Sequence, residues 1–213
     1  SEHARTPGIY FLNDATDPDL PAGPATIALE ILEQLPAADT IVVPMGDTAL
    51  IRGVAAAAKA VSGAIRIIGV QAERAPSYFL SWTHGRATPT ETCDTIADGL
   101  ATRLPDPENV RAIRELVDDV VLVTDDQMLA AIRHLALEEH VIAEPAGAAA
   151  TAALLHGKVP CGRYTVLLVT GANVTPDVLR AALCAPACST RGARVARPGG
   201  RPASGWGPGR AAP

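Results

Sequence analysis

The sequence has few aromatic residues, few cysteines and no long apolar run. Aromatic residues make up 3% of the 213 residues and hydrophobic residues 48%, so the core must be built from Ala, Val, Leu and Ile, as is common where helices cover a parallel sheet. A chain of this length suits one α/β domain with a large core. The four cysteines form no CxxC pair, which argues against a zinc site or a disulfide framework; they are Cys93, Cys161, Cys184 and Cys188.

The chain also lacks an excess of positive charge. Its formal net charge is −5 at pH 7, whereas nucleic-acid binding depends on basic contacts to phosphate, so we expect no nucleic-acid partner. No run of about 18 apolar residues is present to span a membrane. The N-terminal "SEHARTPG" has no apolar core of a secretory signal. We therefore expect a cytoplasmic protein with no membrane partner.

Strand and helix signals alternate along most of the chain. Short apolar runs predict strands at 9–11, 40–44, 65–73, 119–124 and 164–171. Amphipathic or Ala-rich runs predict helices at 24–35, 48–63, 108–116, 124–140, 147–157 and 175–184. Residues 74–107 carry no regular pattern and are expected to be irregular. Because strand–helix–strand units form right-handed crossovers, we predict an α/β fold with three layers, α-β-α, and a mostly parallel sheet.

The composition changes abruptly near Cys188. The following "STRGARVARPGGRPASGWGPGRAAP" has no apolar periodicity and cannot bury enough surface to offset chain entropy. We predict one domain over residues 1–187 and a disordered tail over 188–213. The arginines of the tail could contact RNA or an acidic surface, although a solvated terminus is the simpler interpretation.

The stretch "VVPMGDTALIRG" predicts a buried strand, a tight turn and the start of a helix. Gly46 to Leu50 occupy the turn, where free backbone amides and the helix dipole favour an anion. One glycine in such a turn is equally compatible with an ordinary connection between a strand and a helix. The loop by itself therefore leaves both interpretations open.

This loop is one of five segments that occur in the order of a known family. The segments are "VVPMGDTALIRGVA", "IRIIGVQAE", "TIADGLA", "EPAGAAATAAL" and "LLVTGANV". With the opening "DATDPDLPAGPATIALEILEQ", they resemble the C-terminal half of the threonine dehydratase and serine racemase family over roughly residues 8 to 183. The resemblance implies pyridoxal 5'-phosphate as cofactor and a small amino acid as substrate. It also implies the fold type II, tryptophan-synthase-β-like architecture, with an incomplete large domain in this chain.

The resemblance implies a role in phosphate binding for the loop. Four glycines that precede a leucine in the family map onto Gly46, Asp47, Thr48 and Ala49 before Leu50, so three of them are replaced. Backbone amides can still bind a phosphate, because Asp tolerates the left-handed region and Thr48 could add a hydroxyl donor. The Asp47 carboxylate must then point away from the phosphate or pair with a cation. Otherwise the site no longer binds the cofactor.

Three further residues are implied to contact the cofactor or lie near it. Thr170 falls where the family places a Ser, Thr or Cys facing the pyridine nitrogen, which suits β-elimination; the alternative is that it caps the next turn. Gly171 keeps the backbone close. Glu144, in "EPAGA", fits the family's motif at a helix entry, although Pro145 at the first helical position explains part of that motif.

No metal site is predicted. Glu73 resembles the first carboxylate of a divalent-cation site found in some members of the family, but the second carboxylate would fall near Phe79, so the oxygen cage is incomplete. Asp98 is equally well explained as a turn-forming residue before Gly99.

The chain has only two lysines, Lys59 and Lys158. The family's chemistry needs a lysine that forms a Schiff base and moves the α-proton, and neither lysine stands in the family's Ser-x-x-x-Lys context. That lysine and the substrate loop lie in the family's N-terminal half, so no catalytic residue is identified here. Absence of that half would leave an unpaired sheet edge and an exposed apolar face. This predicts a homo-oligomer, a complementing chain or poor solubility.

Two functions remain open at this point. One is an amino-acid ammonia-lyase of the threonine or serine dehydratase type, incomplete in this chain, which converts its substrate to a 2-oxo acid and ammonia. The other is a non-catalytic relic, or a regulatory or binding module that pairs with a complete homologue. Threonine follows from the family, whereas diaminopropionate or hydroxyaspartate would fit the residues equally well. A nucleotide site is not indicated, because "GDTALIRG" lacks the GxGxxG pattern.

Overall fold

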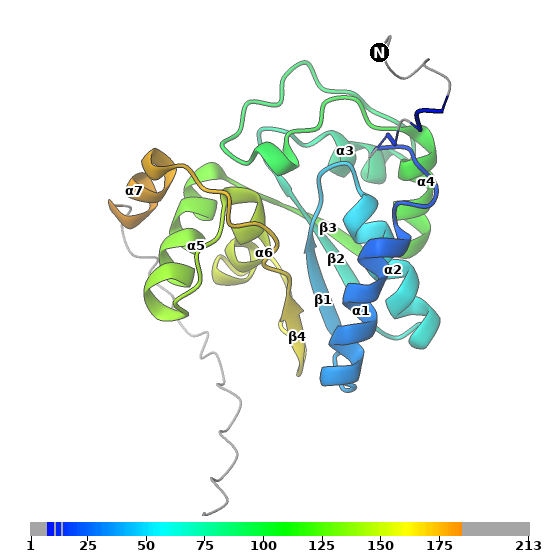
Figure 1. Ribbon diagram of the computed structural model, residues 1–213, viewed down its shortest axis with the longest axis horizontal. Helices are drawn as coiled ribbons and strands as arrows, with labels where there is room; N and C mark the ends of the chain where they lie inside the picture. The colour runs from blue at the N-terminus through cyan, green and yellow to red at the C-terminus, as the bar shows by residue number, and fades with distance from the viewer. Residues whose placement is uncertain (1–7, 11, 14, 185–213) are drawn as a thin grey trace, which may run out of the picture.

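The computed structural model describes residues 8–10, 12–13 and 15–184 (Figure 1). The predicted tail at 188–213 and the domain boundary before it lie outside these residues and stay predictions. The strand predicted at 9–11 is wrong at Ile9 and Tyr10, which are in no strand. The Tyr10 hydroxyl donates instead to the Asp17 carboxylate, so this segment is held by the loop that follows it.

Four parallel strands form one sheet in the order β3-β2-β1-β4. β1 pairs with β2 on one side and with β4 on the other, and β2 pairs with β3. The predicted α/β fold with a parallel sheet is confirmed, although β4 is shorter than predicted. The strands are β1 (Thr40–Pro44), β2 (Arg66–Ala72), β3 (Asp119–Val123) and β4 (Thr165–Leu167).

Two layers of helices cover the sheet, which confirms the three-layer prediction (Figure 1). One layer contains α1 (Ala22–Gln34), α2 (Ala49–Val61), α3 (Ser77–His84) and α4 (Pro107–Leu116). The other contains α5 (Asp125–Glu138), α6 (Pro145–Leu155) and α7 (Pro176–Cys184). None of the helices in the described ranges is long and apolar enough to cross a membrane.

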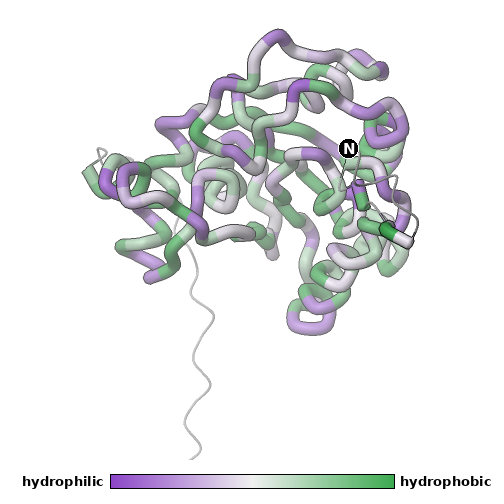
Figure 2. The backbone as a smooth tube through the Cα atoms, turned by 45° about the horizontal axis from the view of Figure 1, so that its top comes forward, coloured by the Kyte–Doolittle hydropathy of each residue, from purple (hydrophilic) through white to green (hydrophobic). Residues whose placement is uncertain are grey.

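Successive side chains of each strand point to opposite faces of the sheet, which divides the core into two parts. Ile41 and Val43 of β1 pack with the α1–α4 layer, whereas Val42 between them packs with the α5–α7 layer. All three side chains are fully buried, since helices cover both faces of the sheet. The strands therefore appear in the sequence as continuous apolar runs. Figure 2 shows many of the hydrophilic stretches in the outer loops.

Helix α5 begins with a side-chain cap. The Thr124 hydroxyl accepts from the Gln127 amide at 3.2 Å, and the Gln127 side chain accepts from the Thr124 amide at 3.0 Å. This capping box satisfies two amides at the helix start. The helix then buries Met128, Ala131, Ile132 and Leu135.

Helix α3 contradicts the expectation that residues 74–107 are wholly irregular. Its first turn depends on tertiary contacts, because the Phe79 amide donates to the buried Gln71 side chain at 2.9 Å. The buried Ser77 hydroxyl donates to the Thr102 carbonyl at 2.6 Å. Gly85 ends the helix with a φ of 73°, the left-handed conformation that glycine adopts without strain. Apart from α3 and a short 3₁₀ turn at Asp98–Leu100, the segment has the irregular path expected.

Candidate functional site

A pocket of about 430 Å³ lies at the carboxyl end of β1. Its walls come from separate parts of the chain, which include the loop 46–50, the segment 98–102, Glu144 and Thr170. The carboxyl ends of parallel strands are where α/β folds usually bind ligands. Seven of the eight predicted site residues line this pocket, and the eighth, Gly171, lies directly behind Glu144.

The loop presents free amides at the start of α2. Directly after β1, the Met45 amide donates to the Val70 carbonyl of β2 at 2.8 Å. The Arg52 amide is the first of α2 to bond to the preceding turn, at the Thr48 carbonyl. No side chain caps this helix start, so its first amides are available to an anion.

Thr48 adopts the left-handed conformation in this loop. Its φ is 74°, a strained value for a β-branched residue, whereas Asp47 beside it is of a residue type that tolerates this conformation better. The Thr48 side chain is buried, and its hydroxyl oxygen has no partner among the described residues. The loop therefore keeps the glycine-like backbone at position 48 and leaves one hydroxyl donor unused.

Gly46 is required by a close contact with the segment 98–102. A Cβ atom at Gly46 would lie 2.2 Å from the carbonyl oxygen of Gly99, so any larger residue would push the two backbones apart. Asp98 lies in the 3₁₀ turn just before this contact and lines the pocket. The Asp98 carbonyl accepts from the Ala101 amide at 3.0 Å. This hydrogen bond is consistent with the turn-forming role expected of Asp98.

Asp47 is exposed, and its carboxylate is bonded to a hydroxyl. The oxygen Oδ1 accepts from the Thr102 hydroxyl at 3.0 Å, and no ion pair within the described part of the chain includes Asp47. The carbonyl of Asp47 accepts from the buried Asn109 side chain at 3.3 Å. Asn109 also donates to the Tyr78 hydroxyl at 3.2 Å, and burial raises the pKa of Tyr78. The loop is thus held by α4 from behind.

Glu144 and Gly171 are in direct contact at the pocket. The Glu144 amide donates to the Gly171 carbonyl at 2.8 Å, and a Cβ at Gly171 would lie 2.2 Å from Oε1 of Glu144. Gly171 therefore has to be glycine for the carboxylate to sit where it does. Pro145 follows as the first residue of α6, as expected. Thr170 is exposed at the pocket, and its side chain makes no capping hydrogen bond in the described residues.

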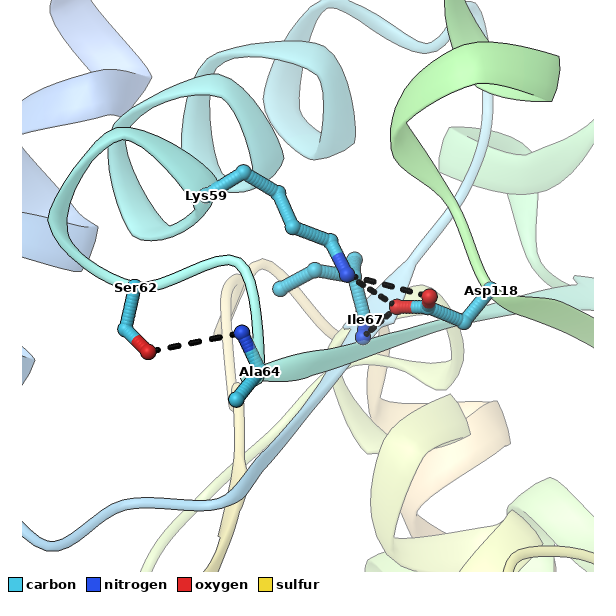
Figure 3. A network of polar contacts seen from close by, with 5 residues as sticks. All are labelled: Lys59, Ser62, Ala64, Ile67 and Asp118. Carbon is cyan, nitrogen blue, oxygen red and sulfur yellow. Dashed lines mark hydrogen bonds and ion pairs between the residues drawn. The ribbon is translucent and has the colours of Figure 1, made fainter.

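Neither lysine lies at the pocket. The Lys59 amine donates to both carboxylate oxygens of Asp118, at 2.7 and 3.0 Å, and Asp118 also accepts from the Ile67 amide at 2.7 Å (Figure 3). The Lys158 amine donates to the Leu122 carbonyl at 2.7 Å. Both amines thus have structural partners. The pocket can hold an anion and place a hydroxyl and carboxylates near it, but it offers no amine.

Sequence reasoning missed Leu20 and Thr102, which also line the pocket. No pattern marks either residue, although the segment "TIADGLA" ends just before Thr102. The backbone amide of Glu73 donates a hydrogen bond to the Val123 carbonyl at 2.8 Å. Within residues 8–184, apart from the undescribed positions 11 and 14, no group of three His, Cys, Asp or Glu side chains could hold a metal ion.

Comparison with known proteins shows which proteins the chain resembles. Residues 1–171 match the family model described as pyridoxal-phosphate dependent enzyme. The catabolic L-threonine dehydratase TdcB of Escherichia coli is 39% identical over 177 residues, which are 82% of this chain and 54% of that protein. The L-threonine ammonia-lyase of Thermotoga maritima is 36% identical, over 81% of this chain and 43% of that protein. The chain spans about half the length of these relatives.

Solved structures show the same similarity. The processed form of threonine deaminase isoform 2 from Solanum lycopersicum aligns with a TM-score of 0.78 at 31% identity, over 85% of this chain and 54% of that one. Maize serine racemase aligns with a TM-score of 0.70 at 34% identity, over 75% of this chain and 50% of that one. These structures confirm the predicted fold type II architecture.

Proposed function

The chain belongs to the family of pyridoxal-phosphate dependent enzymes, and on that basis we propose that it supplies the phosphate side of the active site of an amino-acid ammonia-lyase. The observation that carries the proposal is the pocket itself, where the loop 46–50, Glu144 and Thr170 converge from three separate segments. Free amides at a helix start and an unused Thr48 hydroxyl fit a phosphate group. The residues present therefore suit the family's cofactor on its phosphate side.

Six residues at the pocket have proposed roles. The amides of Ala49 and Leu50 bind the phosphate, and the Thr48 hydroxyl adds a donor. Thr170 would offer a neutral hydroxyl to the pyridine nitrogen, and Gly171 leaves room for the Glu144 carboxylate at the pocket. When bound, the cofactor withdraws electrons from the α-carbon of the amino acid.

The proposed reaction is the conversion of L-threonine or L-serine to a 2-oxo acid and ammonia. The α-proton and the β-hydroxyl leave as water, and a second water molecule is consumed when the carbon–nitrogen bond is hydrolysed. Because both lysines are bonded away from the pocket, we assign the amine of this chemistry to another part of the protein or to a complementing chain. We further propose a cytoplasmic location and an assembly of several chains.

The test is a titration of the purified chain with pyridoxal phosphate, followed by absorbance and by borohydride reduction. We expect saturable binding that leaves Lys59 and Lys158 unmodified, and no ammonia release from threonine by this chain alone. Borohydride trapping on either lysine would show that the chain holds a complete site of its own. A folded chain that binds no pyridoxal phosphate would contradict the site assignment.

A second candidate is a non-catalytic module that pairs with a complete homologue. The specific observation in its favour is Asp47, a negative charge in the loop that would hold the phosphate. The two functions are distinguished by mixing this chain with a polypeptide that carries the Ser-x-x-x-Lys segment and measuring ammonia release. Restored ammonia release with a partner that is inactive alone supports the enzyme, whereas a changed rate of an already active partner supports the module.

A further inference from the structure

We propose that the hydrogen bond between Asp47 and Thr102, here called the Asp47–Thr102 latch, makes an acidic loop able to bind a phosphate. Thr102 is then a positioning residue that acts through the Asp47 carboxylate. The inference rests on the proposed function for the identity of the phosphate, which is that of the cofactor. It adds a residue, Thr102, to a site that sequence patterns did not connect with it.

A free carboxylate at position 47 would oppose an anion in two ways. It would repel a phosphate through its charge, and it could itself accept hydrogen bonds from the uncapped amides at the start of α2. In the structure the Asp47 carboxylate does not accept from these amides. One carboxylate oxygen is 3.0 Å from the Thr102 hydroxyl, and no side chain occupies the amides of α2.

Both partners of the latch have backbones fixed by buried side chains. The Thr102 carbonyl accepts from the Ser77 hydroxyl at 2.6 Å, and the Asp47 carbonyl accepts from Asn109 at 3.3 Å. Ser77 and Asn109 are 0% and 2% exposed. An exposed hydrogen bond between mobile partners contributes little. Because the two backbones are already positioned, forming the latch costs less conformational entropy than a hydrogen bond between mobile partners would.

The latch also joins two of the walls of the pocket. Asp47 belongs to the loop after β1 and Thr102 to the segment between α3 and α4, and both line the pocket. The same two walls touch at Gly46 and Gly99. The contact between Gly46 and Gly99 fixes the spacing of the two backbones. The latch then sets the direction in which the Asp47 carboxylate points.

The test is a double-mutant cycle with two probes, inorganic phosphate and pyridoxal phosphate, titrated by calorimetry. We expect Thr102→Val to weaken binding of both probes about tenfold, since the released carboxylate then competes for the amides. Thr102→Ser keeps the hydroxyl and should bind like the parent chain. Asp47→Asn should bind at least as tightly as the parent, and adding Thr102→Val to it should change nothing further.

Asp98→Asn is the matched control, because it removes one negative charge from the same pocket without touching the latch. Circular dichroism and urea denaturation establish that each variant is folded. The Thr102→Val effect should shrink at about 1 M salt if repulsion contributes to it.

The outcomes separate the latch from the proposed function. Equal effects of Thr102→Val in the parent and Asp47→Asn backgrounds would overturn the latch, as would an Asp98→Asn gain as large as that of Asp47→Asn. Phosphate binding with the expected cycle, but no binding of pyridoxal phosphate, would support the latch and contradict the proposed function. Tight binding of pyridoxal phosphate that none of the substitutions in the cycle changes would support the proposed function and contradict the latch. A folded parent chain that binds neither probe would overturn both.

Discussion

Gly147 lies in the first turn of α6 and touches the backbone of Gly171. A Cβ at position 147 would be 2.6 Å from the carbonyl oxygen of Gly171 and 2.8 Å from its nitrogen. Backbone atoms cannot move aside as a flexible side chain can. Alanine is ordinarily favoured over glycine inside a helix by about 1 kcal/mol, so packing rather than helix propensity requires glycine here.

We predict that Gly147→Ala lowers the free energy of unfolding by about 1 kcal/mol, because overpacking outweighs the gain in helix propensity. Urea denaturation measures the change. Gly23→Ala is the matched control and should be neutral or stabilising, since Gly23 lies in the first turn of α1 and a Cβ added there would have nothing within 4 Å. If Gly147→Ala proves as stable as Gly23→Ala, the close contact at Gly171 is not rigid.

At the scale of the elements, Asp118 joins α2, β2 and the turn before β3 (Figure 3). Burial alone would raise the pKa of Asp118. The hydrogen bonds from Lys59 and the Ile67 amide, together with the charges of Lys59 and Arg66, outweigh burial and lower the pKa from its ordinary value of 3.8. A carboxyl group with a lowered folded pKa adds stability above its unfolded pKa and loses it as the pH falls through the folded pKa.

We therefore predict that Asp118→Asn lowers the free energy of unfolding by about 1 kcal/mol at neutral pH. The difference from the parent chain should begin to narrow as the pH falls through the unfolded pKa of an aspartate, about 3.9. It should narrow further as the pH passes the lower folded pKa, where Asp118 itself becomes protonated. Chemical denaturation at several pH values measures this. Glu33→Gln, on the exposed side of α1, should leave the curve unchanged. A difference that stays constant with pH would mean that the charge of Asp118 contributes nothing.

At the scale of the whole molecule, β4 leaves one side of the sheet open. β4 pairs with β1 along one side only in the described residues. The Leu168 amide donates to the Val42 carbonyl at 3.0 Å, so the alternate amides of Leu167 and Val169 face the open edge. Residues of β4 are half-buried, whereas every residue of β1 is buried. An open, apolar edge is a site for pairing with another chain.

We predict that the purified chain self-associates with rising concentration and that Val169→Lys reduces this, because a charge on the edge opposes pairing. Sedimentation velocity measures the distribution of species. Val61→Lys, at the end of α2, is the control, because Val61 is 59% exposed but away from the edge. Equal effects of both substitutions would point to general solubility rather than to β4.

The sequence by itself determined the order and type of most elements and the family. Strands buried on both faces appear as continuous apolar runs, and local caps such as Thr124 mark a helix start. It failed at Ile9 and Tyr10 and at α3, where the conformation depends on partners distant in the chain. Ser77 meets Thr102, and Phe79 meets Gln71, and no local pattern encodes such pairs.

The same division holds for the site. The resemblance to the family predicted Gly46 to Leu50, Glu144 and Thr170 as site residues, because each stands in one of the matching segments. Only the tertiary structure decided the direction of the Asp47 carboxylate, since its partner Thr102 lies 55 residues away along the chain. A local pattern fixes the backbone of a loop through its own dihedral preferences and hydrogen bonds. The direction of a side chain at a pocket depends on which distant segment packs against it.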